Sequence, residues 1–377
     1  MDENTSAPEP EKAASPHRRT VLKGAAWSVP IVAAAVAVPA QAVSCAPLRN
    51  VTRTVSPSGG ARGDESIVIP NRDRLKEVQY VIVGGAGRGG GANVQSGHDL
   101  GQGGAGRRII GTIPAALLQG STTVRLVAGE MGQSLRGGYG YTNGGAAAMG
   151  AANERFSNGG SGGGSSGLGI IGTGLWIIAG GGGGGGGGQV SGNRPYGNGA
   201  KSIVGDPETN NYWGNGGAVG STGQWGTSGE IASWGNTWTG ARWSGIRGGA
   251  GGGIGGGQGA GGMSPDAAQF EFYGAGNPGN NGNGGRGGFF VYDGLRSYMG
   301  GGGGGGYAGG GGGHAYQQAD TWTNGVPSGS RIYGGSGGGG GSSYIPPELA
   351  STRTSQDAPA GSNGYVTVTF VYEPCPA

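Results

Sequence analysis

The chain has 377 residues, of which 100 are glycine, and only 12% of its residues are charged. The glycines follow no three-residue period and there are only 19 prolines, which excludes a collagen triple helix. A net charge of +3 at neutral pH is too small and too scattered to indicate nucleic-acid binding. Because β-rich segments interrupt the glycine, disorder along the whole chain is not expected either.

Residues 1–42 have the organisation of an export signal. A polar segment leads to Arg18 and Arg19, an apolar run covers residues 25–38, and Ala40 and Ala42 form an A-x-A site, so we expect cleavage after Ala42. The run is shorter and less apolar than the ~20 residues that a spanning helix needs, so no transmembrane segment is expected. The stretch RRTVLK resembles a twin-arginine signal, which implies export of the folded protein by the Tat machinery. An ordinary Sec leader with a chance arginine pair is the alternative.

The mature chain, residues 43–377, is expected to be secreted and to remain in solution or associate with the cell envelope. Its two cysteines, Cys45 and Cys375, lie almost at its ends, and an even count in an oxidising compartment favours a disulfide between them. The alternative is a lipoprotein anchored through Cys45, although the residues before it form a poor lipidation motif. Lys76 and Lys201 are the only lysines after the leader, a bias typical of GC-rich genomes such as those of actinobacteria.

Strand patterns dominate the mature chain, and no capped helical pattern of useful length occurs. The sequence therefore predicts an all-β fold in a single domain. Strands are expected at residues 50–55, 66–69, 78–83, 108–113, 122–128, 175–179, 289–292 and 365–372.

Uninterrupted glycine runs occur at residues 180–188, 300–306, 309–313 and 337–341. One interpretation is flexible linker, because polyglycine is a random coil when isolated. The other is polyglycine II, a left-handed threefold helix without internal hydrogen bonds, which must pair its backbone with parallel neighbours. Several runs of similar length, each pinned by apolar residues, favour the packed form. The backbones can approach each other because glycine lacks a Cβ.

The order of these segments resembles a known family. At residues 80–87 a strand is followed directly by glycines, and a second glycine segment follows at 103–107. A strand pair then ends at 127–129, and the C-terminal part runs from 337–345 to Asn363-Gly364 and the last strand. This order resembles the extracellular glycine-rich domain of the anaplastic lymphoma kinase and leukocyte tyrosine kinase receptors and of bacterial surface proteins. The resemblance implies a jelly-roll-like β-sandwich with an inserted bundle of polyglycine II helices. It does not transfer the receptors' role, since no kinase or membrane-spanning part matches.

The sequence carries no recognisable catalytic motif, cofactor motif or metal-ligand spacing, so we expect a protein that is not an enzyme. No G-K-[ST] follows a glycine loop, and G-x-G-x-x-G matches are expected by chance in such a chain. His98 and His314 lie in polar, glycine-rich loops and are expected to be solvated surface residues. Carboxylates at 64–65, 206–208 and 293 have no diagnostic spacing.

Five of the eight tryptophans fall within residues 212–243: Trp213, Trp225, Trp234, Trp238 and Trp243. They could form a platform for an envelope glycan or protein, or they could cap the glycine bundle. The tripeptide Arg62-Gly63-Asp64 matches an integrin-binding motif, most simply by chance in a chain rich in Gly and Arg. The sequence thus predicts a non-catalytic structural or adhesive surface protein, with a binding module acting through residues 212–243 as the alternative.

Overall fold

The computed structural model describes residues 47–90, 102–134, 136–147, 159–189, 272–274, 279–292, 295–298, 300–323, 326–335 and 337–374. Contacts divide the chain into two units, Met1–Ala46 and Pro47–Ala377, and every described residue belongs to the second. The fold of the described residues is all-β, as the sequence predicted. Their helices are three short 3-10 turns, η1 (Arg72–Arg74), η2 (Ala115–Leu118) and η6 (Pro347–Thr352), and none is long and apolar enough to cross a membrane.

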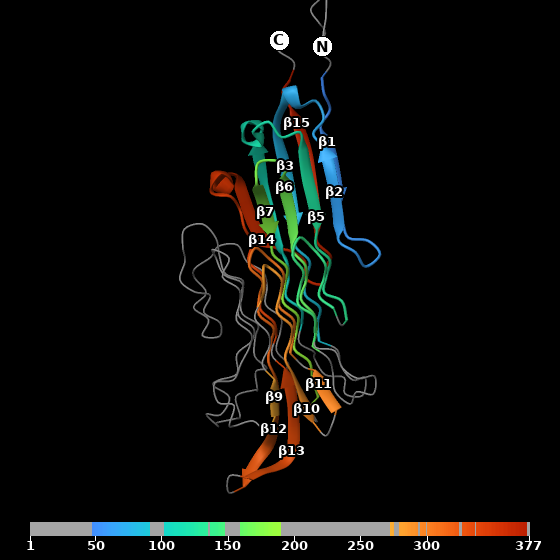
Figure 1. Ribbon diagram of the computed structural model, residues 1–377, viewed down its shortest axis with the longest axis vertical. Helices are drawn as coiled ribbons and strands as arrows, with labels where there is room; N and C mark the ends of the chain where they lie inside the picture. Colours follow the sequence, from blue (N-terminus) through green and yellow to red (C-terminus); the bar gives the residue numbers. More distant parts are fainter. Residues whose placement is uncertain are drawn as a thin grey trace, which may run out of the picture. The chain divides into compact units, whose positions relative to one another are not determined.

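Two antiparallel sheets face each other in the upper part of Figure 1. The first has the strand order β1 (Val51–Val55), β15 (Tyr365–Tyr372), β3 (Leu75–Val83), β4 (Arg107–Pro114), β14 (Arg353–Asp357). The second has the order β2 (Gly63–Val68), β5 (Thr123–Ala128), β6 (Ser166–Ile170), β7 (Leu175–Ala179). The first and last strands of the described chain are thus neighbours in one sheet.

The hydrophobic core lies between these sheets because alternate residues of each strand point inward. Strand β15 shows the alternation over its whole length, with Val366, Val368 and Phe370 fully buried and the residues between them partly exposed. Leu126, Leu168 and other apolar side chains face them from the second sheet. The jelly-roll-like connectivity implied by the resemblance stays a prediction.

The strands expected in the sandwich occur within a few residues of their predicted bounds, and strand β7 occupies the predicted residues 175–179. Strand β6 was missed because its sequence, SGLGI, contains two glycines, which are normally depleted in strands. Strand β14, RTSQD, was missed because it contains no apolar residue and lies at a sheet edge.

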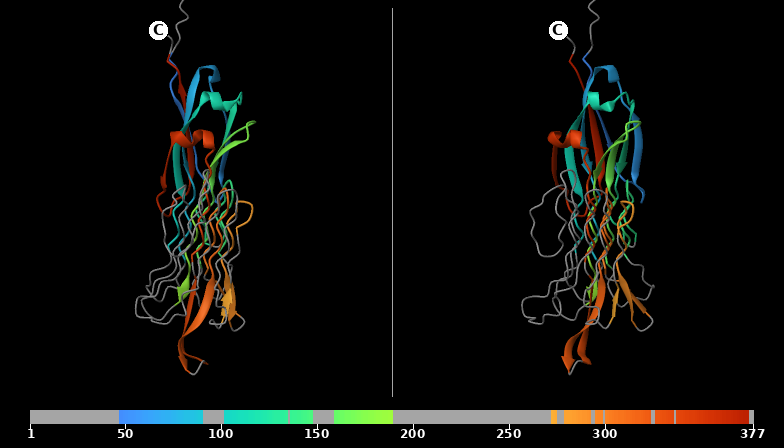
Figure 2. Two further views of the ribbon diagram at one scale, coloured as in Figure 1. Left: turned by 90° about the vertical axis from the view of Figure 1, so that its left-hand side faces the viewer. Right: turned by 60° about the vertical axis from the view of Figure 1, so that its left-hand side comes forward.

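Two smaller sheets lie beyond the glycine-rich part of the chain (Figure 2). One has the order β8 (Gly188–Gln189), β13 (Val326–Gly335), β12 (Ala315–Thr323), β9 (Phe272–Gly274). The other pairs β10 (Phe289–Tyr292), which the sequence predicted, with β11 (Leu295–Tyr298).

The glycine runs are buried and packed side by side between the sandwich and the smaller sheets (Figures 1 and 2). We call residues 180–187 the central run, because it hydrogen-bonds through its backbone to five other segments: residues 84–90, 102–107, 159–164, 300–306 and 337–341. A strand in a sheet has at most two hydrogen-bonded neighbours, so this arrangement is not a sheet.

The partners of the central run repeat every third residue. Gly181 and Gly184 both bond to 300–306 and 337–341, whereas Gly182 and Gly185 both bond to 84–90 and 159–164. The carbonyl groups of Gly180 and Gly183 accept from segment 102–107. A backbone that turns through one third of a circle at each residue produces this repeat.

Glycine is required because neighbouring backbones meet where a Cβ would be. A Cβ on Gly184 would overlap the carbonyl oxygen of Gly160, and one on Gly303 would overlap that of Gly310. Backbone atoms held by hydrogen bonds on several sides cannot move aside as a flexible side chain can. In glycine the Cα–H points at the carbonyl instead, a weak attractive contact.

Candidate functional site

Most residues that the sequence singled out lie outside the described residues. These are the export signal with Arg18, Arg19, Ala40 and Ala42, both cysteines, His98, and the five tryptophans of residues 212–243. The predictions on them stay predictions. Arg62, Asp64 and His314 are described.

His314 is a correction to the sequence-based expectation of a solvated surface residue. It follows the run 309–313 and is completely buried. Burial lowers its pKa from 6.5 to about 4, because the charged imidazolium would lose its hydration. A glycine-rich neighbourhood suggested exposure, but in this fold glycine-rich segments form the interior.

The Arg62-Gly63-Asp64 tripeptide is not a free loop. Gly63 and Asp64 begin strand β2, and the Asp64 carboxylate accepts two hydrogen bonds from Arg125, from Nε at 2.9 Å and from Nη2 at 2.7 Å. Arg62 forms a second ion pair with the same carboxylate at 3.0 Å. These bonds to Arg125 above all hold the pKa of Asp64 below its usual value.

The most distinctive surface in the described part of the chain is the outer face of the sheet β2-β5-β6-β7. Two rows of paired residues cross it. One row contains Ser66, Arg125, Gly169 and Trp176; the next contains Asp64, Val127, Gly167, Ile178 and Tyr344. Paired residues share a face, and the core residues Leu126, Leu168 and Ile177 alternate with them. Both rows therefore lie on the sheet face away from the core, where Val127 and Ile178 are nevertheless buried.

Two glycines in the middle of strand β6 give these rows their shape. A Cβ on Gly169 would lie 2.6–2.7 Å from three atoms of the Trp176 ring, so the Gly169 backbone meets the face of the indole. A Cβ on Gly167 would lie 3.3 Å from atoms of both Trp176 and Tyr141. The two rings contact each other at a centroid distance of 4.6 Å and a 41° tilt. Bare backbone on β6 thus lets the indole of Trp176 lie on the sheet, with the Tyr141 ring tilted against it.

The aromatic surface continues beyond strand β7. Tyr344 bonds to Ile178 through both backbone groups at 2.8 Å, and the ring of Tyr307 stacks on Tyr344 at 4.6 Å and 20°. We call Tyr141, Trp176, Tyr307 and Tyr344 the aromatic strip. All four are partly accessible, Tyr307 most of all, with 39% of its surface exposed. From β6 to residue 344 the strip covers two strand spacings, about 10 Å.

Arginines stand beside the aromatic strip. Arg125 is paired with Gly169, next to Trp176, and its charge opposes the rise that burial causes in the pKa of Tyr141. Arg62 donates to the Gly140 carbonyl at 3.2 Å, one residue from Tyr141. The side chains of Arg62 and Arg125 are 43% and 38% exposed. Two guanidinium groups share the single Asp64 carboxylate, so this group of three carries a net positive charge.

A second cation lies along the same segment. Arg136 covers the ring of Tyr139 at 4.2 Å and pairs in bidentate fashion with the buried carboxylate of Glu130, at 2.7 and 3.1 Å. Arg136 also donates to the Gly60 carbonyl at 3.0 Å. The loop before β2 and segment 136–140 are therefore tied together by two arginines, Arg136 in one direction and Arg62 in the other.

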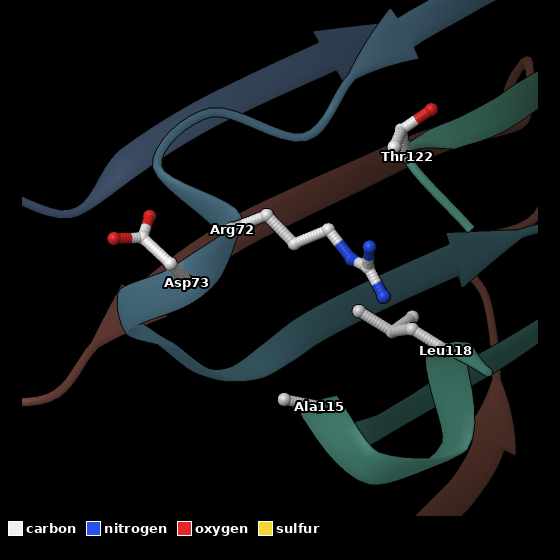
Figure 3. A pocket seen from close by; sticks show the side chains of 5 residues that line it. All are labelled: Arg72, Asp73, Ala115, Leu118 and Thr122. Carbon is white, nitrogen blue, oxygen red and sulfur yellow. The ribbon is translucent and has the colours of Figure 1, made fainter. Parts of the chain in front are cut away.

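One open cavity of about 540 Å³ lies between η1 and η2, at the end of the sandwich opposite the glycine runs. In Figure 3 the guanidinium of Arg72 reaches toward Leu118, while the carboxylate of Asp73 points away from it. Ala115 and Thr122 complete the lining. Ligand pockets need several polar groups that converge, and these two charged groups diverge. The aromatic strip is therefore the better candidate site.

No cluster of three or more His, Cys, Asp or Glu that could hold a metal ion occurs in the part of the chain that the structure describes. Comparison with models of known protein families found no match, and a search of curated proteins found none either. The candidate site is therefore assigned from its geometry alone.

Sequence reasoning missed the aromatic strip and chose the tryptophans of residues 212–243 instead. Trp176 was visible only as part of an apolar strand, and Tyr141, Tyr307 and Tyr344 lie far from it in sequence. The one available signal was the spacing of Gly167 and Gly169, which leaves one face of a strand without side chains. That signal acquires meaning only when the neighbouring strand is known.

Proposed function

We propose that this chain is an exported, non-catalytic surface protein whose glycine runs form a rigid bundle of polyglycine II helices. The bundle separates the sandwich from the sheets at its other end, and the protein acts by presenting surfaces. The three-residue repeat of hydrogen bonds along the central run is the observation that carries the proposal. An interior made of backbone has few side chains to converge on a substrate, so function falls to the outer faces and ends.

The leader and the resemblance support the same proposal. A twin-arginine signal suits a protein whose glycine segments must find partners far apart in sequence, because such a fold can be completed before export. The glycine-rich domains that the chain resembles are extracellular. A structural or adhesive role at the cell envelope follows, with envelope glycans or proteins as partners.

Intact-cell labelling tests the location. The full chain is expressed in an actinobacterial host, and cells are treated with a membrane-impermeant amine- and carboxyl-directed biotin reagent or with external protease. We expect the wild-type protein to be labelled or released into the medium. Replacing Arg18 and Arg19 together by lysine should leave an unlabelled precursor in the cytoplasm.

The controls define what would overturn the proposal. A cytoplasmic marker must stay unlabelled in both strains. A wild-type protein found only inside intact cells contradicts a surface role. Export that continues in the double-lysine variant contradicts only the Tat route, and favours the Sec alternative.

A further inference from the structure

We propose that the aromatic strip and the two arginines beside it, Arg62 and Arg125, bind a carboxylated polysaccharide. The inference rests on the proposed surface role and names a ligand class for it. It assigns binding to the sandwich, whereas the alternative drawn from the sequence assigned it to residues 212–243.

The Trp176 ring has the orientation that sugar binding requires. A pyranose presents a face of C–H bonds, which packs against the electron-rich face of an aromatic ring. Such packing needs rings that lie along a surface rather than stand upright on it. Trp176 lies face-on to Gly169, so its ring lies along the sheet, and the Tyr141 ring beside Gly167 contacts the indole at a 41° tilt. The strip extends about 10 Å across the strands, which suits an extended chain rather than a single compact ligand.

The charge beside the strip selects the kind of polysaccharide. Arg125 uses Nε and Nη2 for Asp64, which leaves its Nη1 group for a ligand. Arg62 is 43% exposed while bonded to Asp64 and Gly140. A guanidinium prefers to bind carboxylate through paired hydrogen bonds. Two arginines held in position by one aspartate therefore complement a chain whose sugar rings carry carboxylates.

A purely structural role explains only part of this surface. Trp176 and Tyr141 could be present simply to cover the bare glycines of β6. That explanation does not extend to Tyr307, which is 39% exposed and stacks on Tyr344 rather than on glycine. Nor does it account for the exposed side chains of Arg62 and Arg125 beside Tyr141.

The test measures binding of the purified full chain to immobilised polygalacturonate, alginate and hyaluronate, with uncharged dextran as the control. We expect binding to at least one of the three acidic polymers and none to dextran. Trp176→Ala should weaken that binding by about tenfold or more, the loss of one stacked ring. Arg62→Gln should weaken it as well and reduce its dependence on salt.

Matched variants separate the site from general attraction to polyanions. Arg72→Gln removes the same charge at the opposite end of the sandwich, and Tyr365→Ala removes a partly exposed tyrosine from strand β15 of the other sheet. Neither should change the affinity. Melting curves confirm that each variant is folded.

The inference would be overturned by no binding to any acidic polymer, by equal binding to dextran, or by equal losses for Arg62→Gln and Arg72→Gln. If Trp176→Ala is folded and binds with unchanged affinity, the inference is also contradicted, because Trp176 would then only pack over the glycines of β6. These measurements use purified protein, so their outcome does not depend on the export experiment. If the protein binds no polysaccharide, it can still be exported to the cell surface.

Discussion

The indole of Trp176 lies face-on against the backbone of Gly169, its partner on strand β6. This relationship joins the fold to the candidate site, because the glycine that weakens the strand is also what allows the ring to lie flat. Aromatic cover over a strand glycine restores part of the packing that the missing side chain would supply.

Gly169→Ala should displace the indole, because the new methyl group would lie 2.6–2.7 Å from three ring atoms. We expect a loss of about 1–3 kcal/mol in the free energy of unfolding, as in other overpacked sites. Gly167→Ala is the matched control, since its methyl group meets the rings at 3.3 Å and needs only a small adjustment. Urea unfolding measures both. Equal effects of the two substitutions would contradict the face-on geometry.

Gly184→Val should destabilise the protein far more. Its Cβ would overlap the carbonyl of Gly160, which is fixed within the bundle. We expect a loss of at least about 3 kcal/mol, beyond ordinary core overpacking. Ala116→Val, at an exposed position of η2, serves as the control and should change stability by no more than about 0.5 kcal/mol. A melting temperature that Gly184→Val leaves unaltered would instead indicate a flexible linker.

Two of the carboxylates that pair with arginine, Glu130 and Asp64, should differ in their contribution to stability. The side chain of Glu130 is 5% exposed and bonds to Arg136 and to the Tyr139 N–H, so Glu130→Gln should cost about 3 kcal/mol. Asp64 is 27% exposed and pairs with arginines that are accessible to water, so Asp64→Asn should cost about 1 kcal/mol or less. Chemical denaturation at neutral pH compares them, and a larger effect at Asp64 would reverse this ranking.

Stability should fall in mild acid because of His314. Its folded-state pKa of about 4 is below the unfolded value of 6.5, so the unfolded chain binds an extra proton between these values. The stabilisation is complete above pH 6.5 and is lost as the pH falls toward 4, by up to about 1.4 kcal/mol per pH unit. Unfolding at pH 7, 6 and 5 should show this slope in the wild type and a shallower one in His314→Gln. Parallel curves would remove His314 as the cause.

The sequence by itself determined the all-β class and most strands of the sandwich. Strand β15 was predictable because one face of its eight residues is buried and the other is not, which forces a period-2 pattern. The need for glycine in runs was also predictable, because an extended backbone without internal hydrogen bonds must find partners. These features depend on residues that are close together in the chain, so they can be predicted from the sequence.

Only the tertiary structure decided which segments meet. Nothing in the central run distinguishes Gly181 from Gly182, yet they bond to different segments, because successive residues of the run point toward different neighbours. The surroundings of His314 and the row from Asp64 to Tyr344 depend on the same long-range pairing. Glycine carries no side chain to encode a neighbour, so in this protein the partners of each segment are settled by how the backbones pack.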